Sequence, residues 1–157
     1  MKYSIHNESK VKELLKENGF PTFRYKQIAN AIYKNYISDF HEMGTIPKKM
    51  REMLDENFSF ETLSVDTQVT SADGQTTKIL FKTSKWEFIE AVIMRHKSWR
   101  NTLCISCQVG CPMACTFCAT GKLGLLRNLE ASEIIEQVYY ACDLLNSEWD
   151  YLRNILY

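Results

Sequence analysis

The sequence predicts an α/β protein in three parts: a helical unit over residues 1–60, an antiparallel β region over residues 61–96, and the start of a β/α arrangement over residues 97–157. Apolar residues recur at helical spacing in the first part and at alternate positions in the second. In the third part, a short apolar run, an amphipathic helix pattern and a final apolar run follow one another, which is typical of a βαβ unit.

The helical unit is expected to contain three helices. The first has Ser9 as its expected N-cap and Gly19 in its stop signal; the second covers residues 23–36; the third begins at Pro47, a residue favoured at the first helical position, and ends near residue 57. The outward side chains of this unit include several basic residues, which are typical of a solvated face. They are Arg24, Lys26, Lys34, Lys48, Lys49 and Arg51.

The antiparallel region is expected to start with alternation from Leu63 and to turn at Asp73-Gly74, a strong hairpin signal. Strands at residues 78–82 and 87–94 then follow. The loop at residues 95–100 is basic and contains a tryptophan, so it fits either a plain exposed loop or a contact with phosphate and a base.

The last part predicts a buried strand at residues 101–106, an amphipathic helix at residues 130–145 and a strand at residues 151–157. Cys142 lies on the apolar side of that helix, so we interpret it as a structural thiol.

Composition limits the classes of function. Lys+Arg and Asp+Glu both number 19, so no global positive field indicates nucleic acid, and any RNA contact has to come from local patches. The sequence contains neither a signal peptide nor an apolar run of about 18 residues, so a cytoplasmic protein without membrane contact is expected.

The cysteines form the main chemical signal, because five of the six fall between Cys104 and Cys118. Such a dense cluster closes loops too short to gain much from disulfides. Within it, the spacing Cys111-x3-Cys115-x2-Cys118 puts three thiolates on one short segment. They can hold three irons of a [4Fe-4S] cluster and leave the fourth iron open to a small molecule with an amino and a carboxylate group.

Other kinds of site fit the same segment less well. A zinc site would pair Cys104 and Cys107 with Cys115 and Cys118, but the separation of seven residues between the pairs is short for a zinc knuckle. The spacing does not fit a bacterial ferredoxin. A redox pair of Cys104 and Cys107 leaves the three later cysteines unexplained.

The segment resembles the RlmN and Cfr family of radical S-adenosylmethionine adenosine methyltransferases. The resemblance covers most of the chain and rests on several motifs. These are Arg24-Tyr-Lys26-Gln27-Ile28, Cys104-Ile-Ser-Cys-Gln-Val-Gly-Cys111, Phe117 before the last cysteine, Cys118-Ala-Thr-Gly121, Gly124-Leu-Leu-Arg127-Asn128-Leu129 and Glu133-Ile134.

The resemblance implies a role for each matching residue. The cluster ligands would be Cys111, Cys115 and Cys118, and Phe117 would bind the cofactor. Cys104 would be a redox cysteine that pairs with a second, methyl-carrying cysteine, which has no counterpart in this chain. Glu90 would be the proton acceptor. Cys107 departs from the serine that is commoner at its position, and Gly121, Gly124 and Arg127 would shape the loop over the cluster.

The resemblance also implies a function: methylation of adenine C2 in 23S rRNA, and also in tRNA, through a methyl-cysteine, with flavodoxin or ferredoxin as electron donor. The helical unit and residues 95–100 would hold the RNA. Two alternatives remain open, a Cfr-type enzyme that methylates adenine C8 and a non-catalytic iron-sulfur or zinc RNA-binding module. A complete β/α barrel needs on the order of 200 residues, so we expect only the first units of an incomplete radical S-adenosylmethionine partial barrel, inactive by themselves.

Overall fold

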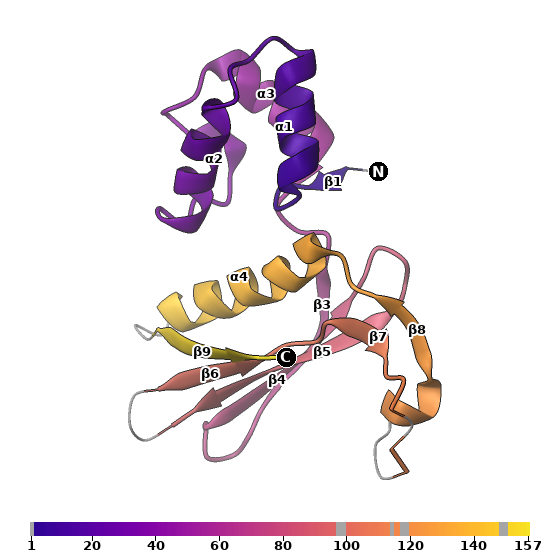
Figure 1. Cartoon of the computed structure of the whole chain (residues 1–157). Helices are drawn as coiled ribbons and strands as arrows, with labels where there is room; N and C mark the ends of the chain where they lie inside the picture. The colour runs from indigo at the N-terminus through magenta and orange to yellow at the C-terminus, as the bar shows by residue number, and fades with distance from the viewer. Residues whose placement is uncertain (1, 97–99, 114, 117–119, 148–150) are drawn as a thin grey trace. The chain divides into compact units, whose positions relative to one another are not determined.

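The chain forms two compact units in the computed structural model, Met1–Thr62 and Leu63–Tyr157 (Figure 1). The structure describes residues 2–96, 100–113, 115–116, 120–147 and 151–157. None of the described helices is long and apolar enough to cross a membrane.

The first unit contains the three predicted helices. They are α1 (Glu8–Glu17), α2 (Arg24–Tyr33) and α3 (Lys48–Asn57), with the 3-10 helix η1 (Phe40–Glu42) and a parallel pair of short strands, β1 (Tyr3–Ser4) and β2 (Phe58–Ser59). The expected N-cap of α1 is wrong. Asn7 caps the helix instead of Ser9, because the Asn7 side chain accepts a hydrogen bond from the Lys10 amide at 3.2 Å.

The second unit is built on a five-stranded sheet in the order β3-β4-β5-β6-β9. Its strands are β3 (Ser64–Thr70), β4 (Thr76–Lys82), β5 (Phe88–Arg95), β6 (Asn101–Cys104) and β9 (Leu152–Leu156). Strands β3 to β6 pair antiparallel, whereas β6 and β9 pair parallel and are connected through α4 (Ala131–Ser147). The sheet therefore runs without a break from the antiparallel region into the βαβ unit.

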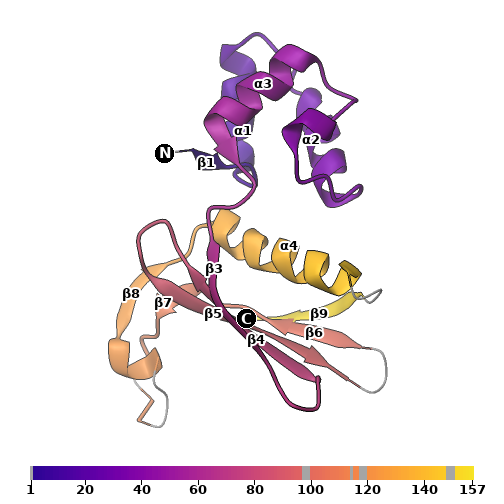
Figure 2. The same ribbon diagram turned by 180° about the vertical axis from the view of Figure 1, so that it is seen from behind.

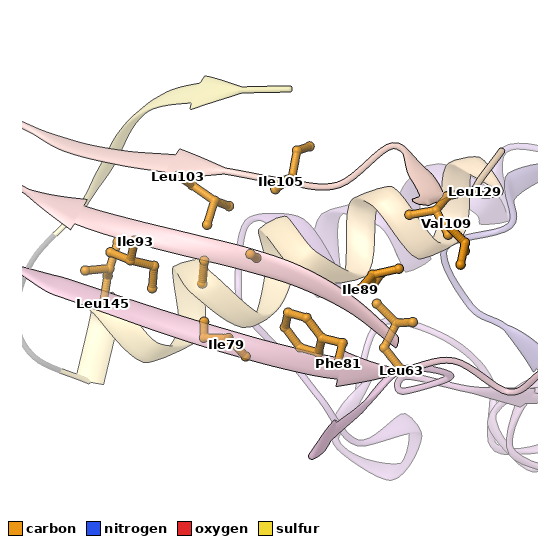
Figure 3. Packing of buried hydrophobic residues seen from close by; sticks show 12 residues of the cluster. Leu63, Ile79, Phe81, Ile89, Ile93, Leu103, Ile105, Val109, Leu129 and Leu145 are labelled. Atoms are coloured by element: carbon orange, nitrogen blue, oxygen red, sulfur yellow. The ribbon is translucent and has the colours of Figure 1, made fainter. Parts of the chain in front are cut away.

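Helix α4 covers one face of this sheet (Figures 1 and 2). Alternate residues of the strands, such as Ile79, Phe81 and Ile93, are fully buried beneath the helix (Figure 3). Ala141 and Leu145 of α4 are also fully buried in this cluster. The burial of this apolar surface is the main source of stability for the unit.

Two features of the second unit were not evident from the sequence. Every residue of β3, the edge strand of the sheet, is exposed, although apolar and polar residues alternate along it. The sequence also did not predict the short antiparallel pair β7 (Gln108–Gly110) and β8 (Leu125–Asn128), nor the 3-10 helix η2 (Thr120–Leu123) before β8.

Candidate iron-sulfur loop and catalytic face

The face of the five-stranded sheet opposite α4, called here the open face, carries two of the expected catalytic residues. Because side chains alternate along a strand, Lys78 and Leu80 of β4 point away from the buried Ile79 and Phe81. On β5 the same alternation puts Glu90 opposite to its buried neighbours Ile89 and Ala91.

Glu90 is about half exposed and forms an ion pair with Lys78, with 2.6 Å between Nζ and Oε1. These two side chains line an open hollow of about 480 Å³ on the sheet. Its other lining residues are Thr67, Val69, Ser71, Thr76 and Leu80. Lys78 carries no signal in the sequence beyond its place in the hairpin partner strand.

Cys104, the last residue of β6, is half-buried and lies on the same face as Glu90. The register pairs it directly with Val92 of β5, which is two residues from Glu90. Diagonal neighbours of this kind have Cα atoms roughly 7–8 Å apart. The open face thus brings together a carboxylate and a thiol from separate strands.

The cysteine loop, residues 111–124, is closed at its base by the pairing of β7 with β8. The Cys111 amide donates a hydrogen bond to the Gly124 carbonyl at 3.0 Å. Gly110 has a φ of +77°, and a Cβ atom at this position would lie 1.9 Å from the Gly124 oxygen. Only glycine fits this approach, so the backbone at Gly110 fixes where the cysteine loop begins.

Cys111 and Cys115 are half-buried free thiols on this loop. Cys118 and Phe117, the other residues assigned to the cofactors, lie outside the described residues. Within the described part of the chain, no group of three His, Cys, Asp or Glu side chains converges on a metal position. Two soft thiolate donors on one closed loop suit an iron-sulfur cluster in their chemistry.

Arg127 of β8 anchors the cysteine loop to the rest of the unit. Its guanidinium donates to Glu87 at 2.6 and 2.8 Å and to Glu133 at 2.7 and 2.8 Å. Glu133 also accepts from the Glu130 amide at 2.8 Å, as in a capping box at the start of α4. Arg127 therefore ties β8 both to the turn before β5 and to the helix.

The charges in this cluster stabilise one another. Hydrogen bonds from Arg127 hold the pKa of Glu87 below its ordinary value. Burial acts to raise the pKa of Glu133, but hydrogen bonds from Arg127 and from the Glu130 amide outweigh it, so this pKa is also lowered. The same two carboxylates raise the pKa of Arg127.

Gln137 of α4 holds the segment between β6 and β7. This side chain is fully buried; its Oε1 accepts from the Ser106 amide at 3.0 Å, and its Nε2 donates to the Ser106 carbonyl at 2.9 Å. Ser106 Oγ in turn donates to the Glu90 carbonyl at 2.8 Å. The chain that leads from Cys104 to the cysteine loop is thereby fixed next to Glu90.

The sequence also drew attention to two further cysteines and to the basic loop at residues 95–100. Cys107 is an exposed free thiol. Cys142 is a half-buried thiol on α4 whose pKa is raised by burial. In the basic loop at residues 95–100, Arg95 donates to Thr77 Oγ1 at 2.7 Å, and Trp99 lies outside the described residues.

Comparison with known proteins places these features in a family. Residues 6–59 match the model of the ribosomal RNA large subunit methyltransferase N-terminal domain. The chain is 44% identical over 131 residues to the ribosomal RNA large subunit methyltransferase Cfr of Staphylococcus warneri, which covers 83% of this chain and 38% of that protein. It is 43% identical over 140 residues to the probable dual-specificity RNA methyltransferase RlmN of Mycobacterium marinum, covering 88% of this chain and 38% of that protein.

A solved structure is also similar. A radical SAM methyltransferase from Sphaerobacter thermophilus superimposes with a TM-score of 0.86 and 35% sequence identity, over 98% of this chain and 45% of the other. The chain therefore spans about two fifths of the length of the curated relatives that it matches.

Proposed function

Because this chain belongs to the RlmN and Cfr family of radical S-adenosylmethionine methyltransferases, we propose that it serves in methylation of an adenosine in 23S rRNA. Enzymes of this family use S-adenosylmethionine and an iron-sulfur cluster. The observation that carries the proposal is the placement of the cysteine loop, which starts from the same segment that fixes Cys104 beside Glu90.

We assign the cluster ligands to Cys111, Cys115 and Cys118, and the contact with the cofactor to Phe117. When bound, the cluster and S-adenosylmethionine supply one-electron chemistry that the protein's own side chains cannot perform. The part played by the chain is to hold the ligands: the Gly110–Gly124 approach and the Cys111 amide position the loop, and Arg127 fastens it to β5 and α4.

Glu90 is proposed as the group that accepts a proton from the methylated adenine. It projects from the open face, and the ammonium of Lys78 at 2.6 Å orients its carboxylate. A carboxylate accepts a proton directly when the proton donor comes within hydrogen-bond reach.

Cys104 is proposed as the redox cysteine. Its thiol lies on the open face, on the side of Glu90, and would form a disulfide with a methyl-carrying cysteine that is not part of this chain. The substrate would be adenine C2 in 23S rRNA and in tRNA, in a cytoplasmic protein that takes electrons from flavodoxin or ferredoxin. A Cfr-type reaction at C8 is the second candidate, since relatives of both kinds are equally similar to the chain.

Deletion of the gene in the cells that encode it tests this function without assumptions about the isolated chain. We expect nucleoside mass spectrometry of 23S rRNA to show loss of 2-methyladenosine, restored by a gene copy with Cys107→Ser but not by one with Glu90→Gln. Loss of 8-methyladenosine would favour the second candidate. Unchanged adenosine methylation in both rRNA and tRNA would contradict the proposal.

A further inference from the structure

We propose that Trp86, in the turn between β4 and β5, is a stacking platform for a base of single-stranded RNA, and that Lys82 beside it contacts the neighbouring phosphate. The inference rests on the RNA-directed function proposed above. It adds the residue that holds the strand close to the catalytic face.

The backbone conformation of Trp86 is the first observation. Its φ is +67°, in the left-handed region that favours glycine, and its side chain is 75% exposed. A bulky residue is strained there, and burial of the indole does not offset that strain. Packing therefore does not explain why a tryptophan occupies this position.

Hydrogen bonds fix the backbone of the turn that carries Trp86. The Trp86 amide donates to the Thr83 carbonyl at 3.0 Å, and the Thr83 amide donates to the Glu87 carbonyl at 2.8 Å. Thr83 Oγ1 accepts from the amides of Lys85 and Glu87, both at 3.2 Å. A fixed turn presents the indole with little loss of conformational freedom on binding, which favours affinity.

The surroundings of Trp86 combine a cation with aromatic surface. Lys82 Nζ lies 3.7 Å from the centroid of the indole ring. Phe88, which pairs with Lys82 across the two strands, is half-exposed. Among the residues that the structure describes, no carboxylate lies within ion-pair distance of Lys82. Proteins that bind single-stranded nucleic acid stack its bases on aromatic rings and contact its phosphates with positively charged side chains.

The position of the turn connects this surface to the proposed site. Lys82 belongs to the same side of β4 as Lys78 and Leu80, so it shares the open face with Glu90. Glu87, next to Trp86, is bonded to Arg127 of β8, the strand that closes the cysteine loop. An RNA strand that places an adenine at Glu90 would thus pass the indole within a few nucleotides.

Binding of a short fluorescein-labelled oligoadenylate to the chain, measured by fluorescence anisotropy, tests the proposal. We expect Trp86→Gly to weaken binding about tenfold, whereas Trp86→Phe keeps a ring and weakens it less than about threefold. Lys82→Gln should lower the slope of log affinity against log salt by about 1. Because glycine relieves the positive φ, the melting temperature of Trp86→Gly should stay equal or rise.

The outcomes separate this inference from the proposed function. If the parent chain binds the oligoadenylate and Trp86→Gly binds it equally well, the stacking platform is refuted while the function stands. If Trp86→Gly loses affinity only together with a lower melting temperature, the role of Trp86 is structural and the inference also fails. A parent chain that does not bind this RNA would also refute the stacking platform, whereas the proposed function is decided separately by the nucleoside mass spectrometry.

Discussion

The two faces of the sheet in residues 63–157 are made by alternate residues of the same strands, yet they differ in cover and in chemistry. On β4, Phe81 is 1% exposed and packs edge-to-face on Tyr140 of α4 at 5.3 Å between ring centroids, whereas its neighbour Leu80 lines the hollow on the open face. The covered face is mainly apolar, with Ile79, Phe81 and Ile93 buried on it, and the open face carries Lys78, Glu90 and Cys104. Because successive side chains of a strand point to opposite faces, the same strand can stabilise the core on one face and present reactive groups on the other.

The largest difference in stability between the faces should appear when the side chains of two adjacent residues, one on each face, are shortened to alanine. We expect Phe81→Ala to lower the free energy of unfolding by about 3–5 kcal/mol, because it leaves a cavity beneath α4. Leu80→Ala should lower it by less than about 1 kcal/mol, since no element of the described unit covers that side. Urea unfolding of the two variants measures both values, and equal losses would contradict the division into faces.

Arg127 of β8 bonds Glu87, in the turn before β5, and Glu133 of α4. We expect its removal to have the next largest effect on the free energy of unfolding. Arg127→Ala leaves Glu87 and Glu133 without their shared cation, and we expect a loss of about 3 kcal/mol. Lys48→Ala is the matched control, because the Lys48–Glu52 pair is largely exposed and should contribute less than about 1 kcal/mol. A loss for Arg127→Ala as small as that of the control would show that the cluster is not needed for stability.

The same cluster predicts a pH dependence. The pKa values of Glu87 and Glu133 are lowered in the folded state, so their contribution is complete above the unfolded value of about 4.3 and is lost as pH falls through the folded values. Acid unfolding followed by circular dichroism should show this loss in the parent chain. The dependence should be flatter in Arg127→Ala, and identical acid profiles would contradict the assignment.

The base of the cysteine loop offers a smaller, local comparison between two glycines. Gly110→Ala combines a positive φ with a clash against the Gly124 carbonyl, so we expect a loss of about 2 kcal/mol and a weakened β7–β8 pairing. Gly74→Ala has a similar φ of +71° but no atom within 4 Å, and should cost about 1 kcal/mol. Hydrogen exchange of the Cys111 amide reports directly on the pairing, and unchanged protection in Gly110→Ala would refute it.

The smallest expected effect on stability lies on the open face itself. Lys78→Gln removes an ion pair whose two side chains are about half exposed, so the free energy of unfolding should change by less than about 1 kcal/mol. Thermal unfolding measures it. A loss of unfolding free energy comparable with that of Phe81→Ala would mean that the open face contributes substantially to the stability of the fold.

The elements that follow a long, regular pattern were predictable from the sequence. The three N-terminal helices, the hairpin around Asp73-Gly74 and the helix that became α4 all show a clear period or a strong turn signal. The N-cap of α1 was missed, because Asn7 and Ser9 are both good caps and only the fold selects between them. The exposure of β3 depends on which strand becomes the edge of the sheet, which alternation alone does not specify.

The residue types of the site were predictable from the sequence, but the strands and contacts that hold these residues in place were not. The spacing of Cys111 and Cys115 indicated a cluster loop, but β7 and β8 have only three and four residues, too short for a periodic signal. The hydrogen bonds of Gln137 with Ser106 join residues that are 31 positions apart, and those of Arg127 with Glu87 join residues that are 40 positions apart. Such contacts are set by tertiary packing and leave no local pattern.

The most direct test of the account is the iron content of the chain after anaerobic reconstitution with iron and sulfide, compared between Cys115→Ser and Cys107→Ser. We expect the parent chain and Cys107→Ser to take up about four irons each with a broad visible absorption band, and Cys115→Ser to lose most of both. Tight zinc binding without iron, or an equal loss in Cys107→Ser, would contradict the assignment of the cysteine loop.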